Sequence, residues 1–152
     1  MRILIATGIF EPEVGGPATY APKIASALVA EGWDVTVLTY SSQARYDFDS
    51  SYNFRLVRIV RGSSTLLGVN KIFNRIKFFL ALMRLSRSAD VIYTLDWFAA
   101  GVPVAVAAGI LEKPYIVRVG GDYAWEQRYL ESGAPPMSLL DFYEKGVHRQ
   151  GR

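Results

Sequence analysis

The sequence predicts an α/β fold, a Rossmann-like, doubly wound parallel sheet with helices on both faces. Short apolar runs rich in Val and Ile recur along the chain, and they do not alternate with polar residues. Such runs are typical of strands that are covered on both faces. Helical patterns lie between them, and this alternation indicates parallel strands joined by right-handed crossovers. The length of 152 residues suits one domain, so residues 1–152 are expected to form a single unit.

Each element has its own signal in the sequence. The expected strands are 3–6, 35–39, 56–60, 91–95 and 115–119. Helices are expected at about 18–31, 70–87 and 98–111, with Gly32 ending the first and Pro103 near the start of the third. The Ser-, Asp- and Tyr-rich link 40–54 is expected to be a mobile surface loop. Ser138 is placed to cap a last helix that runs through Val147.

Composition excludes several classes of protein. The chain is 51% apolar and 20% charged, the balance of a globular protein. It has no cysteine, which removes disulfides and zinc–thiolate sites and fits a reducing compartment, so a cytoplasmic location is expected. A net charge of +3 is too modest to indicate nucleic-acid binding. The longest apolar stretch, 97–111, falls short of the roughly 20 residues of a membrane-spanning helix.

The most specific feature is the loop after the first strand, which ends in Gly15-Gly16 and opens a helix. In open α/β sheets, ligands bind beyond the carboxyl ends of the strands. Paired glycines at a helix start let backbone N–H groups approach an anion, and phosphate is the natural guest. The loop is neither a dinucleotide fingerprint nor a P-loop. The alternative is that Gly15 and Gly16 only make a tight turn.

The layout resembles the opening of family 4 glycosyltransferases. The resemblance rests on Phe10-x-Pro12-x-x-Gly15-Gly16, the turn at 31–35 and the runs 89–93 and 113–117. It implies the two-domain GT-B fold, with residues 1–152 as the N-terminal, acceptor-side half. It also implies a nucleoside diphosphate sugar as co-substrate, no other cofactor and no metal. A C-terminal donor-binding domain is expected outside this chain, which is therefore expected to fold alone but not to catalyse transfer.

The resemblance also implies roles for particular residues. Gly15 and Gly16 would approach the donor diphosphate, while Asp96 and Trp97 would help to shape the acceptor pocket. The residue type of Asp96 favours a cap of the third helix over a ligand role, and both roles can hold. The Asp47-Phe48-Asp49 sequence matches a metal-binding Asp-x-Asp motif, but it lies away from where that motif belongs. No metal site is expected there.

A second group of candidates follows the fifth strand. Arg118, Gly121 and Tyr123 are assigned to acceptor binding. Many relatives carry a histidine around Gly120 or Gly121, but the only histidine of this chain is in the terminal segment. This departure leaves Asp122 as the catalytic candidate, with a turn residue as the alternative.

The segment 71–87 carries five basic residues and no acidic one. One apolar stripe (Ile72, Ile76, Phe79, Met83) is expected to dock on the sheet, and a second one (Phe78, Leu82, Leu85) lies on roughly the opposite side. Such a helix can meet an anionic membrane surface, or a neighbouring loop or domain can cover it. The membrane contacts would be Lys71, Arg75, Phe78 and Arg84.

The predicted function is sugar transfer, with retention, from a nucleoside diphosphate sugar to a glycan or lipid-linked acceptor. The expected location is the cytoplasm, at the inner face of the membrane if the basic helix binds lipid. The alternative is a non-catalytic Rossmann-like binding or interaction domain. An NAD(P)-dependent oxidoreductase is disfavoured because the first loop lacks the dinucleotide fingerprint.

Overall fold

The computed structural model describes residues 1–61, 69–120 and 137–146, with only the backbone for 69–71. These residues fall into two compact units, Met1–Arg118 and Val119–Arg152, which are described separately. The first unit holds the sheet and its helices. In the second, the described helix α5 (Leu139–Glu144) begins as predicted, because the Ser138 hydroxyl accepts a hydrogen bond from the Asp141 N–H at 3.1 Å. Val147 lies outside the described residues.

The first unit is built on a five-stranded sheet of order β3-β2-β1-β4-β5, and every neighbouring pair is parallel. The strands are β1 (Arg2–Thr7), β2 (Asp34–Ser41), β3 (Arg55–Val60), β4 (Val91–Thr94) and β5 (Tyr115–Val117). The predicted α/β, Rossmann-like class is confirmed. Because all five strands are parallel, their carboxyl ends meet at one edge of the sheet, and the loops that leave this edge lie together.

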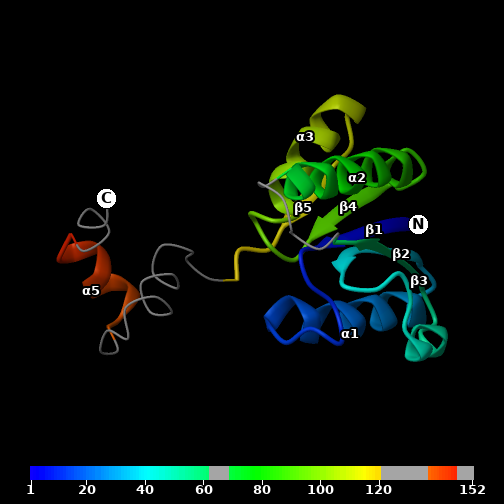
Figure 1. Cartoon of the computed structure of the whole chain (residues 1–152), viewed down its shortest axis with the longest axis horizontal. Helices are drawn as coiled ribbons and strands as arrows, with labels where there is room; N and C mark the ends of the chain where they lie inside the picture. Colours follow the sequence, from blue (N-terminus) through cyan, green and yellow to red (C-terminus); the bar gives the residue numbers. More distant parts are fainter. Residues whose placement is uncertain (62–68, 121–136, 147–152) are drawn as a thin grey trace. The chain divides into compact units, whose positions relative to one another are not determined.

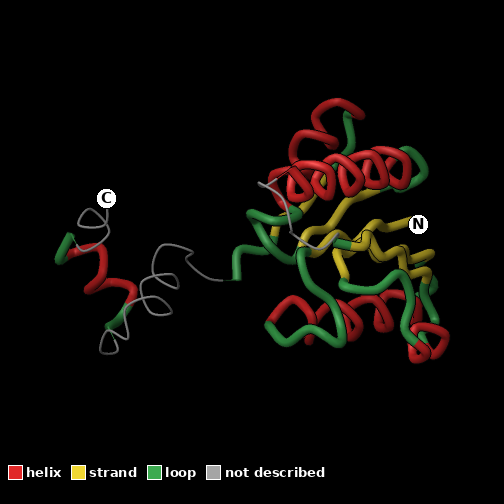
Figure 2. Tube along the Cα trace, in the orientation of Figure 1, coloured by secondary structure: helices red, strands yellow, loops and turns green. Residues whose placement is uncertain are grey.

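Helices cover both faces of the sheet. Helix α1 (Gly16–Ala30) packs on one face, while α2 (Val69–Ser86) and α3 (Gly101–Leu111) pack on the other (Figures 1 and 2). Each face of the sheet has its own hydrophobic core, and adjacent β1 residues pack into different ones. Ile5 faces α1, and Leu4 faces α2 and α3. Both are essentially inaccessible to solvent, as expected for a strand buried on both sides. Within the described residues, no helix is both long and apolar enough to cross a membrane.

Helix α2 docks on the sheet by the stripe that was expected to face outward. Phe78 and Leu82 are 0% exposed, whereas Ile72 is 61% exposed and Ile76 49%. The Phe78 ring stacks on that of Tyr40, at 4.3 Å between centroids and 15° between planes. Both stripes are apolar enough to be buried, so helical spacing alone could not rank them. Packing against the core of the sheet, which includes the Tyr40 ring on β2, decides. The prediction of Phe78 as a membrane contact is therefore wrong.

The polar link between β2 and β3 is better organised than a mobile loop. It contains a short 3₁₀ helix, η1 (Asp47–Ser51), which is joined to β3 by an ion pair. The Arg58 guanidinium donates to both carboxylate oxygens of Asp49, at 2.9 and 2.7 Å, and it lies over the rings of Tyr46 and Phe10. These contacts were not apparent from the sequence because Arg58 belongs to the next strand.

Candidate functional site

The carboxyl edge of the sheet gathers the segments that the sequence analysis marked as functional. The β1–α1 loop, Arg61 after β3, the turn after Thr94 and Arg118 after β5 all lie at this edge. Backbone hydrogen bonds connect them: the Leu95 N–H donates to Ala6 O at 3.1 Å and the Arg118 N–H to Thr94 O at 2.8 Å. The parallel register therefore brings the predicted strand-end residues of the first unit to one place.

Gly15 and Gly16 have different structural roles. Gly15 has φ 155° and ψ 166°, a backbone region essentially restricted to glycine, and an added Cβ would lie 2.5 Å from Ile9 Cδ1. At Gly16 an added Cβ would meet no heavy atom within 4 Å. Gly15 makes the turn, and Gly16 leaves open space at the start of α1. The N-cap residue Gly15 has no side chain, and no other side chain of the described residues caps this start, so the first-turn N–H groups lack the side-chain acceptor that an anion could replace.

The glycine loop is fastened to the rest of the sheet edge at several points. Glu11 accepts a hydrogen bond from the Tyr52 hydroxyl at 2.6 Å, and burial together with this carboxylate raises the pKa of Tyr52. Arg61 pairs with Glu13 at 3.1 Å and donates to the carbonyl oxygen of Gly8 at 2.6 Å. A loop held by two neighbouring segments keeps its backbone N–H groups in fixed positions, which favours binding of a ligand without reorganisation.

Asp96 joins two loops through its carboxylate. One oxygen accepts from the Gly8 N–H at 2.6 Å, and the other accepts from the Ala100 N–H at 2.7 Å. The second bond caps the turn that leads into α3, which begins at Gly101 rather than at residue 98 because of this turn. The prediction of Asp96 as the N-cap of this helix is wrong, because the N-cap residue of α3 is Ala100 and Asp96 instead closes the turn before it. The acceptor role of Asp96 stays a prediction. Trp97 is exposed beside it, with its ring edge-to-face with Phe98 at 5.5 Å.

Arg118 lies next to the helix that the glycine pair opens. Its guanidinium carbon is 4.3 Å from the ring centroid of Tyr20, in the second turn of α1, which is a cation–π distance. The end of β5, predicted to bind the acceptor, therefore lies beside α1, whose start was predicted to bind the donor diphosphate. Gly121, Asp122 and Tyr123 lie outside the described residues, so their roles stay predictions.

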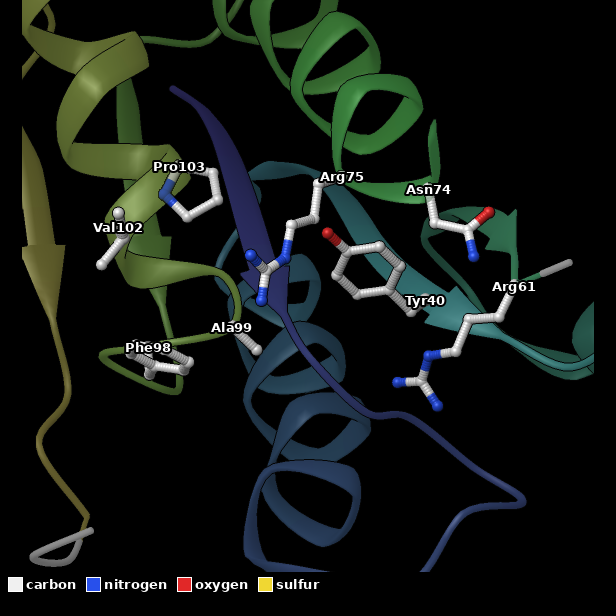
Figure 3. Close-up of a pocket in the computed structure, with 8 residues that line it drawn as sticks. All are labelled: Tyr40, Arg61, Asn74, Arg75, Phe98, Ala99, Val102 and Pro103. Atoms are coloured by element: carbon white, nitrogen blue, oxygen red, sulfur yellow. The ribbon is translucent and has the colours of Figure 1, made fainter. Parts of the chain in front are cut away.

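A cavity of about 450 Å³ at the same edge was missed by the sequence analysis (Figure 3). Its lining residues come from the ends of β2 and β3, the start of α2 and the turn into α3: Tyr40, Arg61, Asn74, Arg75, Phe98, Ala99, Val102 and Pro103. Among the described residues, the lining contains two arginines and no carboxylate. Burial raises the pKa of the Tyr40 hydroxyl although the charges of Arg75 and Arg61 oppose this, so the hydroxyl remains a proton donor.

Only one residue that lines this cavity was among the predicted site residues, and for another reason: Arg75 was assigned to the membrane. Arg61 could have been found because it directly follows a predicted strand. Of the other membrane candidates, Arg84 is exposed near the end of α2, and the side chain of Lys71 lies outside the described residues. Among the described residues, no group of three or more acidic or histidine side chains could hold a metal. In the Asp47-Phe48-Asp49 motif, the Asp49 carboxylate is already paired with Arg58.

Several solved structures share the fold of this chain. Sucrose-phosphate synthase from Thermosynechococcus elongatus has a TM-score of 0.59 at 17% identity, over 96% of this chain and 39% of that one. MurG from Acinetobacter baumannii has a TM-score of 0.57 at 18% identity, over 90% and 43%. HepE from Anabaena, solved with UDP and glucose, has a TM-score of 0.55 at 18% identity, over 77% and 29%. The TM-scores show a shared fold, and at these low identities they show nothing more. This chain spans less than half of each of the three structures.

Family membership rests on the sequence itself. No curated protein matches the chain. The family model described as "Glycosyl transferase 4-like domain" matches residues 15–152, a span that begins at the glycine pair. It therefore covers the opening of α1, the cavity-lining segments of α2 and α3, and Arg118. With nine-tenths of the chain matched, this protein belongs to the glycosyl transferase 4-like domain family.

Proposed function

We propose that this chain forms the acceptor side of a glycosyltransferase that uses a nucleoside diphosphate sugar and retains the configuration at the anomeric carbon. The donor-binding half of the active site would come from a further domain, since the chain spans only 29–43% of the glycosyltransferase-type structures compared above. The HepE structure holds UDP and glucose, which supports a nucleotide sugar as the donor here.

The open start of α1 is the observation that carries the proposal. Gly16 leaves space for a ligand atom to reach the backbone, and the 15-residue helix behind it directs the positive end of its dipole to the same point. A diphosphate leaving group gains negative charge as the glycosidic bond breaks. Backbone N–H groups that are already in place stabilise that charge more in the transition state than in the ground state. The departing diphosphate would then help to deprotonate the acceptor hydroxyl, so no protein nucleophile is needed.

Substitution of Gly16 tests this proposal. In the full protein, Gly16→Val is expected to lower kcat/KM for sugar transfer about 10- to 100-fold, because the valine side chain occupies the space that the diphosphate needs. The melting temperature should stay nearly unchanged, since an added Cβ meets nothing within 4 Å. Transfer is measured by release of the nucleoside diphosphate, and the product anomer by NMR.

Gly109→Val serves as the matched control. Gly109 is also a helical glycine with no heavy atom within 4 Å of an added Cβ, but it lies near the end of α3, away from the glycine loop. This variant should use the nucleotide sugar with the KM of the wild type. If Gly16→Val transfers sugar like the wild type, the glycine pair is only a turn and the proposal fails. A protein that binds nucleotide sugar tightly but never transfers it would instead be a binding domain.

We also propose that the protein works at an anionic membrane surface and that the outer face of α2 makes the contact. This face consists of four exposed apolar residues, Ile72, Phe73, Ile76 and Leu80. Lys77 and Arg84 are exposed on the same helix, which carries no acidic residue. Exposed apolar side chains flanked by cations are typical of an interfacial helix that meets anionic headgroups.

Vesicle binding tests this surface. Co-sedimentation with vesicles that contain anionic lipid is expected to be salt-sensitive. It should fall severalfold for Phe73→Ser with Ile76→Ser, and also for Lys77→Glu with Arg84→Glu. Val14→Ser is the control, because Val14 is apolar and even more exposed but lies in the β1–α1 loop. Equal binding to anionic and neutral vesicles at low salt would assign the outer face of α2 to protein packing.

A further inference from the structure

The cavity at the carboxyl edge of the sheet combines positive charge with an apolar wall. Arg75 comes from α2 and Arg61 from the end of β3, and Figure 3 shows both guanidinium groups extending toward the space beside the Tyr40 ring. On the opposite side the lining is apolar: Phe98, Ala99, Val102 and Pro103. A site of this kind suits a ligand that has an anionic group and a hydrocarbon part next to it.

The two arginines are not equivalent. Arg61 already pairs with Glu13 and donates to Gly8 O, and its guanidinium carbon lies 5.4 Å from the ring centroid of Tyr40. Arg75 is exposed and makes no ion pair with a carboxylate of the described residues. Arg75 is therefore the cation available to a ligand, while Arg61 helps to position the cavity wall and adds to its positive potential.

Tyr40 supplies a neutral donor at the same place. Its ring is fixed between the stacked Phe78 ring and the Arg61 guanidinium, and its hydroxyl points toward Arg75 (Figure 3). Because burial raises its pKa, the hydroxyl stays protonated at neutral pH and can donate to an anion. A guanidinium and a fixed hydroxyl on the same side of a cavity match the several acceptor oxygens of a phosphate group.

The apolar wall continues beyond the cavity along α3. Val102 lines the cavity, and Val106 and Ile110 follow it at four-residue intervals, so the three side chains form one stripe on the helix surface. All three are at least half exposed, and α3 carries no charged residue. A hydrocarbon chain that leaves the cavity at Val102 would find a continuous apolar track.

We propose that this cavity binds the acceptor substrate through a phosphate group, and that the acceptor is an amphiphile whose hydrocarbon chain lies along Val102, Val106 and Ile110. The inference rests on the proposed glycosyltransferase function, because it assigns this cavity to the acceptor rather than to the donor. It places the phosphate between Arg75 and the Tyr40 hydroxyl. The acceptor hydroxyl would extend from there toward the glycine loop, which Arg61 connects to the cavity through Gly8 O.

Calorimetric titration of the full protein with decyl phosphate, below its micelle concentration and at low salt, tests the proposal without any sugar transfer. Decyl phosphate is expected to bind at least tenfold more tightly than inorganic phosphate, because part of its chain is buried. Arg75→Gln should weaken it about tenfold or more, as loss of a charge-assisted hydrogen bond predicts. Tyr40→Phe should weaken the binding of decyl phosphate severalfold. Val102→Asn should weaken the binding of decyl phosphate but not that of inorganic phosphate.

Arg84→Gln is the matched control, since Arg84 is an exposed arginine of the same helix that does not line the cavity; its affinity should stay within twofold of wild type. The proposal would be overturned if Arg75→Gln bound decyl phosphate as tightly as the wild type. It would also be overturned if neutral decyl glucoside bound as tightly as decyl phosphate. Competitive displacement of decyl phosphate by uridine diphosphate would overturn it too, because it would assign the cavity to the donor. None of these outcomes affects the Gly16 test, because Gly16 does not line this cavity.

Discussion

Replacing Arg58 with methionine is expected to destabilise the protein by about 3–5 kcal/mol, since it leaves a carboxylate in a largely buried site without its cation. The Arg58 side chain is 1% exposed and that of Asp49 is 11% exposed. The guanidinium also lies over the Phe10 ring, at 5.3 Å from its centroid, and Phe10 is the buried anchor of the glycine loop. Chemical denaturation followed by circular dichroism measures the loss.

Two controls separate this ion pair from a general effect of removing arginine. Arg2→Met removes an exposed partner of Asp90 and should change stability little. The double variant Arg58→Met with Asp49→Leu should recover much of the loss, because no unpaired charge remains. If the single and double variants are equally destabilised, packing of the guanidinium over the rings, and not the ion pair, holds η1 on β3.

The same pair predicts the direction of the pH dependence. Burial alone would raise the pKa of Asp49, but hydrogen bonds from Arg58 and from the Tyr46 N–H outweigh it and hold the pKa below its ordinary value of 3.8. A carboxyl whose folded-state pKa is depressed contributes stability above its unfolded-state pKa and loses it as the pH falls through the folded-state pKa. The double variant should therefore lose less stability than wild type between about pH 4 and pH 2.

Asp96→Ala is expected to lower the stability by about 2–4 kcal/mol, because it leaves the N–H groups of Gly8 and Ala100 without an acceptor. It should also reduce sugar transfer, since Asp96 holds the glycine loop against the turn into α3. Asp96→Asn keeps one acceptor oxygen and should retain a larger part of the stability. Thermal unfolding and turnover are measured on the same preparations.

The asparagine variant separates the two roles of Asp96. If turnover falls about tenfold or more while the melting temperature remains near that of wild type, the carboxylate also serves the acceptor. If stability and turnover fall together, its role is only to hold the two loops together. Asp34→Ala is the control, because Asp34 is an exposed aspartate at the amino end of β2, away from this edge. A wild-type melting temperature for Asp96→Ala would contradict the bridging role.

Much of the first unit could be predicted because its signals are local. The five apolar runs became the five strands, with bounds that shifted by one or two residues, and the helices followed in the expected order. The position of Gly15-Gly16 was predictable for the same reason: a strand followed by a glycine pair and a helical pattern can only place that pair at the carboxyl edge. In the candidate site, Asp96 and Arg118 reached this edge as well, since each lies one or two residues after the end of a strand.

What the tertiary structure alone decided are contacts between segments far apart in the chain. Helix α2 had two apolar stripes of similar quality, and only packing against the sheet and α3 selected Phe78 and Leu82 for burial. The cavity needed the same kind of information, because its lining comes from four segments between Tyr40 and Pro103. A sequence by itself determines local periodicity, turn geometry and the order of strands and helices, because these depend on neighbouring residues. Which stripe is buried, and which charges meet, depends on the free energy of packing whole elements against one another.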